Sequence, residues 1–184
     1  MKSWDELKTE CMQCRRCKLG DTRTNLVFGV GNPNADLMFI GEGPGEQEDL
    51  RGEPFVGRAG QFLDQMLALI NLSRDDIYIA NIVKCRPPNN RDPQPDERTA
   101  CSEWLFAQIE LINPRLIVCL GRIAAMCLIN PDFKITREHG QWTPFLGGRE
   151  ITAIYHPAAL LRDPAKRPET FVDLKSIQAK YSAL

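Results

Sequence analysis

The chain has 184 residues, of which 43% are hydrophobic and 26% charged, and its net charge is −1. This size and composition are typical of a soluble globular protein, so we expect residues 1–184 to form a single domain and to act as a monomer. No apolar run reaches the roughly 18 residues of a membrane span, and the polar start lacks a signal-peptide core, which predicts a cytoplasmic protein. The chain is not basic overall, so any nucleic-acid binding must depend on a local patch.

Buried strands and amphipathic helices are predicted to alternate along the chain. Ser3 and Glu6 have the spacing of a capping box at the start of a short first helix. The predicted strands are residues 35–41, 76–83, 115–121 and 149–157, and the predicted helices are residues 58–70, 95–112, 122–129 and 168–184. This alternation predicts an α/β protein with a parallel sheet of four strands and helices on both faces.

Unusual residues stand where the predicted strands end. The segment GEGPGEQED, residues 41–49, follows the first strand and brings carboxylates, but no lysine, to a glycine-rich turn. Asn81 and Lys84 lie near the end of the second strand, Gly121 ends the third, and His156 ends the fourth. Because ligands of open parallel sheets bind outside the carboxyl ends of the strands, these residues indicate one site.

Each of these residues, taken alone, also has a plain structural explanation. The glycines suit any tight connection between a strand and a helix, and His156 suits a hydrogen-bonded core position. Phe55, in a loop between glycines, suits either the core or a stacking platform, and His139 is predicted to be a solvated loop residue. Together, these residues at the strand ends indicate a functional site more specifically than any one of them does alone.

The seven cysteines divide into two groups. Cys119 and Cys127 lie in apolar segments and are expected to be buried. The others lie in polar surroundings and are Cys11, Cys14, Cys17, Cys85 and Cys101. CMQCRRC contains two overlapping C-x2-C pairs, each of which places two thiolates on one turn, and Cys85 and Cys101 complete a set of four. Zinc and an iron–sulfur cluster both suit four thiolates, and the long gap after Cys17 favours the cluster.

Four blocks of the sequence together resemble one known family. GEGPGEQED, GEPFVGRAG, NIVKCRPPNNRDPQPDE and YHPAALLR have the order and spacing of the iron–sulfur uracil-DNA glycosylases, the family-four branch, from about Cys14 to Arg162. The resemblance implies a three-layer α/β/α sandwich around a short four-stranded parallel sheet. It also implies a [4Fe–4S] cluster on Cys14, Cys17, Cys85 and Cys101, with Cys11 as the surplus thiol. The implied activity is hydrolysis of uracil from single- or double-stranded DNA.

The resemblance also implies roles at the strand ends. The implied catalytic residues are Glu42, His156 and Glu48, and the implied uracil pocket is formed by Glu42, Gly43, Phe55, Asn81 and His156. A carboxylate suits the positive charge that develops on the sugar, and His156 would donate to the leaving uracil. The best-known uracil glycosylases carry an aspartate and a tyrosine where this chain has Gly43 and Gly45. Another residue must therefore exclude the thymine methyl, and Glu48 is our candidate.

YHPAALLR resembles the family's DNA-insertion loop. The predicted DNA-binding residues are Arg86, Arg91, Leu160, Leu161 and Arg162, with Lys166 and Arg167 as further candidates for phosphate contact. Two other functions remain open. The first is a four-cysteine module that binds damaged DNA without cutting it. The second is a relative that traps DNA covalently through a histidine in a basic insert, although VKCRPPNNR contains no such insert.

Overall fold

A six-stranded sheet forms the centre of the molecule. The computed structural model describes residues 1–184 and gives the strand order β1-β3-β2-β4-β6-β5. The strands are β1 (Val30–Gly31), β2 (Leu37–Gly41), β3 (Tyr78–Asn81), β4 (Leu116–Leu120), β5 (Thr143–Phe145) and β6 (Arg149–Ile154). The inner four run parallel, whereas β1 and β5 pair antiparallel with β3 and β6.

The inner strands are those that the sequence predicts, but the expected count of four is wrong because two short strands extend the edges. β1 has two residues and β5 has three, one of them Pro144. Such segments lack the apolar pattern over four or more residues that indicates a strand, and proline is tolerated in a sheet at its edge. The additions widen the sheet without moving the ends of its parallel strands.

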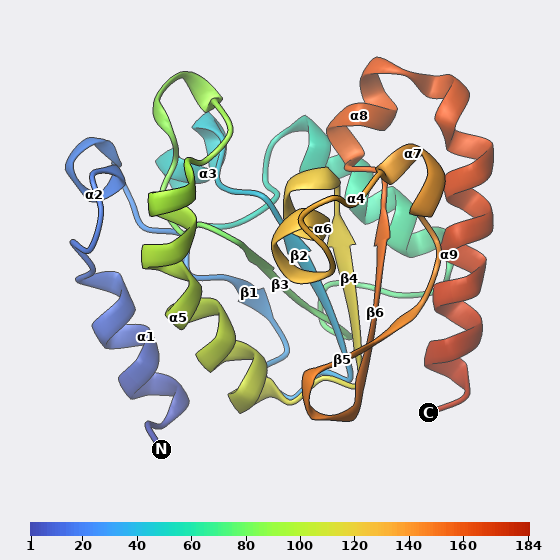
Figure 1. Ribbon diagram of the computed structural model, residues 1–184, viewed down its shortest axis with the longest axis horizontal. Helices are drawn as coiled ribbons and strands as arrows, with labels where there is room; N and C mark the ends of the chain where they lie inside the picture. Colours follow the sequence, from blue (N-terminus) through green and yellow to red (C-terminus); the bar gives the residue numbers. More distant parts are fainter.

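Helices cover both faces of the sheet (Figure 1). They are α1 (Trp4–Met12), α2 (Leu19–Thr22), α3 (Glu46–Arg51), α4 (Arg58–Leu69), α5 (Pro95–Ile112), α6 (Arg122–Leu128), α7 (Ile135–Glu138), α8 (Pro157–Arg162) and α9 (Arg167–Ser182). α1, α5 and α6 share one core with Met38 and Ile40 of β2, and α4 and α9 share the other with Leu37 and Phe39. Because strand side chains alternate between faces, the two cores lie on opposite sides of the sheet. The predicted three-layer sandwich is confirmed.

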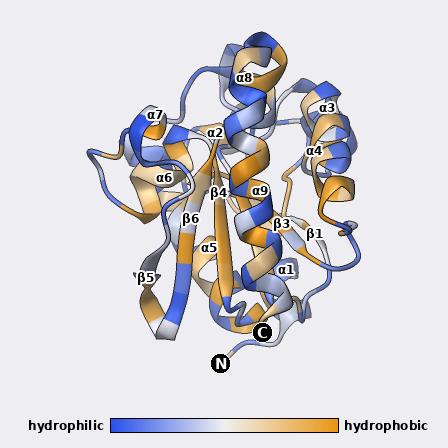
Figure 2. Cartoon of the chain, turned by 90° about the vertical axis from the view of Figure 1, so that its right-hand side faces the viewer, coloured by the Kyte–Doolittle hydropathy of each residue, from blue (hydrophilic) through white to orange (hydrophobic).

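The hydropathy of the chain matches these layers. The inner strands are mostly hydrophobic, apart from the hydrophilic start of β6, and the helices carry hydrophilic residues on their outer sides (Figure 2). All five residues of β2 and of β4 are buried. Each fully buried Leu, Ile or Phe contributes roughly 1.5 to 3 kcal/mol to the free energy of folding. None of the helices is both long and apolar enough to cross a lipid bilayer.

Local signals fix the start of the long helices. The Oγ of Ser3 accepts a hydrogen bond from the N–H of Glu6 at 3.2 Å, and the Glu6 carboxylate accepts one from Ser3 at 2.7 Å. This is the predicted capping box. Pro95 occupies the first turn of α5, whose bounds are the predicted ones. The short helices α2, α3, α7 and α8 were not expected, because one or two turns carry no readable period.

The carboxyl ends of the parallel strands meet at the upper edge of Figure 1. β2 ends at Gly41 and leads to α3, and β3 ends at Asn81 and leads to the proline-rich segment 84–97. β6 ends two residues before His156, which is the N-cap of α8. The fold therefore brings the predicted residues to one edge.

Candidate active site

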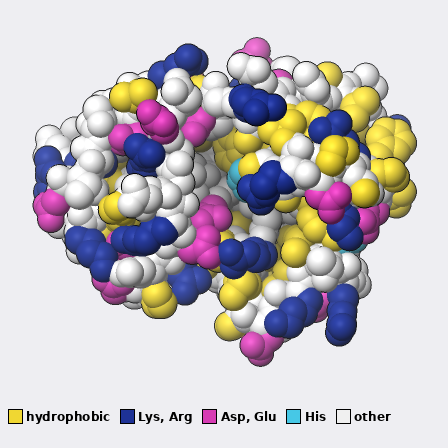
Figure 3. All heavy atoms as spheres, turned by 90° about the horizontal axis from the view of Figure 1, so that it is seen from above, with side chains coloured by type: hydrophobic (Ala, Val, Ile, Leu, Met, Phe, Trp, Pro, Cys, Tyr) yellow, Lys and Arg dark blue, Asp and Glu magenta, His cyan; other side chains and the backbone are white.

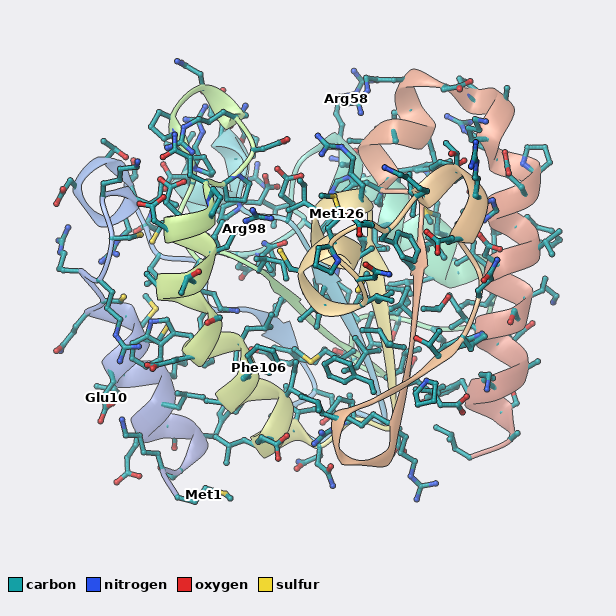
Figure 4. The ribbon with its side chains drawn as sticks, viewed as in Figure 1. Met1, Glu10, Arg58, Arg98, Phe106 and Met126 are labelled. Atoms are coloured by element: carbon teal, nitrogen blue, oxygen red, sulfur yellow. The ribbon has the colours of Figure 1, made fainter.

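A cleft of about 350 Å³ opens at this edge. The predicted residues that line it are Glu42, Gly43, Glu48, Phe55, Asn81, His156, Arg91 and Arg162. Figure 3 looks onto the edge and shows a hollow with histidine in its wall and Lys and Arg side chains around its rim. A second groove, between α5 and α6, is bordered by Phe106 and Met126 and contains none of the predicted residues (Figure 4).

Asn81 presents an unpaired acceptor at the cleft. Its side chain is only 2% exposed, and its Oδ1 has no hydrogen-bond partner within the protein. Gly41 makes room for this group, because a Cβ there would lie 2.6 Å from Oδ1 and 2.7 Å from the Phe55 ring. A buried oxygen without a donor costs free energy, so this atom is suited to a ligand that brings an N–H.

The hydrogen bonds of His156 determine which ring nitrogen carries the proton. Its Nδ1 accepts from the backbone N–H of Ala158 at 3.0 Å, so Nε2 holds the proton of the neutral ring. Burial and the nearby Arg162 together lower the pKa of His156 to about 4, although Glu48 opposes the shift. The ring is therefore a neutral donor at pH 7. Its centroid lies 5.6 Å from that of Phe55.

Glu42 is half-buried and has a second carboxyl group beside it. Burial and the neighbouring Asp92 raise the pKa of Glu42 to about 7, whereas Arg122 lowers it. Arg122 binds Asp92 at 2.7 Å and holds the pKa of Asp92 below its usual range. Two carboxylates in contact do not both ionise easily, so Glu42 carries the higher pKa of the pair. It exchanges a proton near neutral pH.

Glu48 lies in the wall of the cleft, but backbone amides use its oxygens. Oε1 accepts from the N–H of Gly45 at 3.1 Å, and Oε2 accepts from Val56 at 2.9 Å and Gly57 at 2.8 Å. These three charge-assisted hydrogen bonds give the Glu48 carboxylate a structural role that does not require it to take part in catalysis. It joins the start of α3 to the loop that carries Phe55.

Four of the cysteines line one small, mostly apolar cavity. They are Cys14, Cys17, Cys85 and Cys101, the predicted set, whereas Cys11 is fully buried on α1 and does not line it. Three of the sulfurs accept hydrogen bonds: from Trp104 at 3.2 Å, from Arg23 at 3.4 Å and from the backbone of Lys84 at 3.2 Å. Cys119 is buried as expected. The expectation for Cys127 is wrong, because it lies on the exposed side of the short helix α6.

The surroundings of this cavity suit an anionic group. Lys84 is fully buried, and its Nζ bonds only to the neutral Oε1 of Gln108, at 2.5 Å. Burial lowers the pKa of Lys84 to about 8 and raises that of Cys101 to about 11. No three His, Cys, Asp or Glu side chains are gathered tightly enough for a single metal ion. Four cysteine thiols that line one cavity are the kind of donor set that iron–sulfur clusters use.

Three of the predicted DNA-binding residues make contacts within the protein. Arg91 binds the buried Glu97 through two bonds, at 2.7 and 2.9 Å, so its guanidinium is committed to that ion pair. Leu160 is 1% exposed and packs in the core beneath α8, so it does not fit the insertion role that the sequence suggests. The next residue along the helix, Leu161, is half-buried, and Arg162 is exposed. Arg86 bonds to Asn90 at 2.8 Å.

No clear sequence signal marks the position of His139, which lies outside the cleft, or of two polar residues at the cleft. Asn90 lines it with a left-handed backbone, φ 55°, and Asp92 contacts Glu42. Both sit in the proline-rich segment among other polar residues, where nothing singles them out. His139 was expected in solvent, but its ring is held between Asp173 at 2.6 Å and Glu169 at 2.9 Å. Its partners lie 30 and 34 residues away, beyond the reach of a local pattern.

Comparison with known proteins identifies the family and agrees with this fold. Residues 28–176 match the model of the uracil DNA glycosylase superfamily, so the chain belongs to that superfamily. Similar proteins include type-4 uracil-DNA glycosylases of three organisms. The identity is 48% with that of Archaeoglobus fulgidus (96% of this chain, 92% of the relative), 47% with Thermotoga maritima (82% and 79%) and 45% with Sulfurisphaera tokodaii (97% and 84%). Within the superfamily, the chain belongs to the type-4 uracil-DNA glycosylases.

Proposed function

We propose that this protein excises uracil from DNA in repair, by hydrolysing the N-glycosidic bond and leaving an abasic site. The names of its relatives support this activity. The unpaired Oδ1 of Asn81 is the observation that carries the proposal, because uracil offers an N3–H donor to match it. The amide nitrogen of the same side chain suits the uracil O4. Reaching this pocket requires the base to be flipped out of the DNA, at a cost of a few kcal/mol.

Two residues suit the charges that develop as the bond breaks. The neutral His156 donates from Nε2 to the uracil O2, on which negative charge grows. Glu42, once ionised, accepts a proton from the attacking water and stabilises the cationic sugar. Phe55 stacks on the flipped base, and Gly43 leaves space beside it. Glu48 holds the pocket loops through its bonds to backbone amides, a role that differs from the exclusion of thymine.

The DNA would lie along the edge that contains the cleft. Arg162 and Arg86 suit phosphate contact, and Leu161 suits the space left by the flipped base. The proposal includes both single- and double-stranded DNA as substrate. It also includes one domain over residues 1–184, a monomer, and a cytoplasmic location.

We further propose a [4Fe–4S] cluster on Cys14, Cys17, Cys85 and Cys101. Iron–sulfur clusters are bound by cysteine thiolates, and thiolates on a cluster would supply the anion that the buried Lys84 lacks. Such a group adds no step to hydrolysis and would cross-link the N-terminal segment to the proline-rich segment. The three N–H donors to sulfur support the same assignment.

One assay tests the activity. The purified protein is incubated with a uracil-containing oligonucleotide, and alkali then cleaves the DNA wherever an abasic site has formed. We expect strand breaks at the uracil and none in the same sequence with thymine. Binding without breaks would favour the non-cutting DNA-binding module instead. A protein–DNA adduct that survives denaturation would favour the covalent trap.

A further inference from the structure

The loop that carries Phe55 adopts a backbone conformation that is rarely seen for a bulky residue. Phe55 has φ 54°, in the left-handed region where an aromatic side chain is strained. A Cβ at Gly60 would lie only 1.8 Å from the Phe55 carbonyl oxygen, so that position must be glycine for the loop to keep this path. Strain of this kind persists only where the surroundings hold it.

Arg74 holds the carbonyl side of the loop. It lies in the turn after α4, outside every sequence block assigned to the site. Its guanidinium donates to the carbonyl oxygens of Pro54 at 3.1 Å, of Phe55, and of Gly60 at 3.3 Å. Asp64 accepts from its Nε at 2.6 Å and fixes the plane of the group. A planar fork of donors can bind several carbonyls at once, which a lysine cannot do.

Glu48 holds the amide side of the same peptide group. The N–H of Val56 belongs to the peptide bond whose oxygen is that of Phe55, and it donates to Glu48 at 2.9 Å. One peptide unit therefore has a cation on its oxygen and an anion on its N–H. Rotation of this unit would break both charge-assisted bonds together. The φ angle of Phe55 depends on the preceding peptide unit, whose Pro54 oxygen Arg74 also binds.

We propose that Arg74 is a positioning residue for base recognition. With Glu48, it holds the Phe55–Val56 peptide in the orientation that keeps the Phe55 ring in the cleft, 5.6 Å from the ring of His156. The inference rests on the proposed role of Phe55 as the platform for the flipped base. Arg74 itself touches neither the base nor the sugar.

The test compares Arg74→Met with Arg74→Lys in single-turnover excision of uracil. We expect Arg74→Met to lower the maximal rate about tenfold, which corresponds to 1.4 kcal/mol, and Arg74→Lys to lower it less. The DNA concentration at half-saturation should change less than about twofold, because phosphate contacts dominate affinity. Arg115→Met is the matched control, since Arg115 pairs with Asp36 at the opposite edge of the sheet and should not affect the rate.

A double-mutant cycle separates positioning from general damage. In a Phe55→Ala background, Arg74→Met should cause no further loss, because there is no ring left to place. Equal losses in both backgrounds, or a full rate in Arg74→Met, would overturn the inference. Hydrogen exchange of residues 53–60 provides a readout without activity: Arg74→Met should lose protection there, and unchanged exchange would also overturn it. If Arg74→Met does not fold, the same measurements on Arg74→Lys test whether Arg74 is a positioning residue.

The cycle also distinguishes this inference from the proposed function. A wild-type protein that leaves uracil in DNA would refute the function, while hydrogen exchange would still decide whether Arg74 holds the loop. If the Phe55→Ala variant kept the full rate, the proposed stacking role of Phe55 would be refuted, but the proposed excision of uracil would not.

Discussion

The carboxyl groups of Glu42 and Asp92 are in hydrogen-bond contact, one at the end of β2 and the other in the proline-rich segment. Arg122 binds Asp92 and leaves the shared proton with Glu42. Glu42, the proposed general base, and the proline-rich segment that carries Asp92 are thereby electrostatically coupled.

This contact predicts the pH dependence of the reaction. Burial and Asp92 raise the pKa of Glu42 to about 7, so below that pH the group is protonated and cannot accept a proton from water. The single-turnover rate should rise with pH and level off above about 7. Asp92→Asn removes a neighbouring negative charge, so the midpoint should move to lower pH. An unchanged midpoint in that variant would contradict the coupling.

A second prediction concerns the leaving group. His156→Ala should slow the chemical step by roughly ten- to a thousand-fold, the range expected on loss of one oxyanion donor. Binding to abasic product should change much less. His139→Ala is the matched control, because the other histidine lies outside the cleft and should affect thermal stability instead. Equal losses of rate and binding in His156→Ala would make that residue structural.

The third prediction concerns the cysteine cavity. Protein purified without oxygen should be brown and contain about four irons per chain. Cys85→Ser or Cys101→Ser should lose iron and solubility together, whereas Cys11→Ser should keep both. The exposed Cys127 provides a neutral control through Cys127→Ser. A colourless protein with one zinc ion would refute the cluster, and iron loss in Cys11→Ser would refute the ligand set.

The fourth prediction concerns how Asn81 reads the base. Cytosine presents an acceptor at N3 and a donor at N4, the reverse of uracil, and each buried mismatch costs on the order of 1 to 3 kcal/mol. Two mismatches give roughly ten- to ten-thousand-fold discrimination. Asn81→Asp replaces a donor by an acceptor of nearly the same shape, so uracil excision should weaken and some cytosine excision should appear. Single-turnover assays on matched oligonucleotides measure both. Full uracil activity in the variant would show that Asn81 does not read the base.

The parallel strands and the residues at their ends could be predicted because both depend on local pattern. A run such as LMFIG indicates a buried strand, and the residue that follows it lies at the ligand-binding edge of any parallel sheet. Asn81 was recognisable because a polar residue interrupts an apolar run.

What the sequence could not supply are contacts that depend on tertiary structure. Arg74 reaches three carbonyls 14 to 20 residues away, and no periodicity distinguishes it from a solvated arginine. Leu160 and Leu161 are neighbours of the same type, and only the orientation of α8 decides that one is buried and the other half-buried. Cys127 was expected in the core for a similar reason, since an apolar seven-residue helix does not reveal its buried side.

The bond from Ala158 to His156 has a mechanical consequence. Because the first free N–H of α8 selects the tautomer of the ring, the orientation of the proposed donor to uracil depends on the position of the helix that carries Leu161 and Arg162. If α8 contacts the DNA as proposed, we expect a tilt of this helix to turn the donor with it. In the proposed function, correct docking of α8 on the DNA and correct orientation of the donor toward the departing base would therefore occur together, and DNA that keeps α8 displaced would also misdirect this donor.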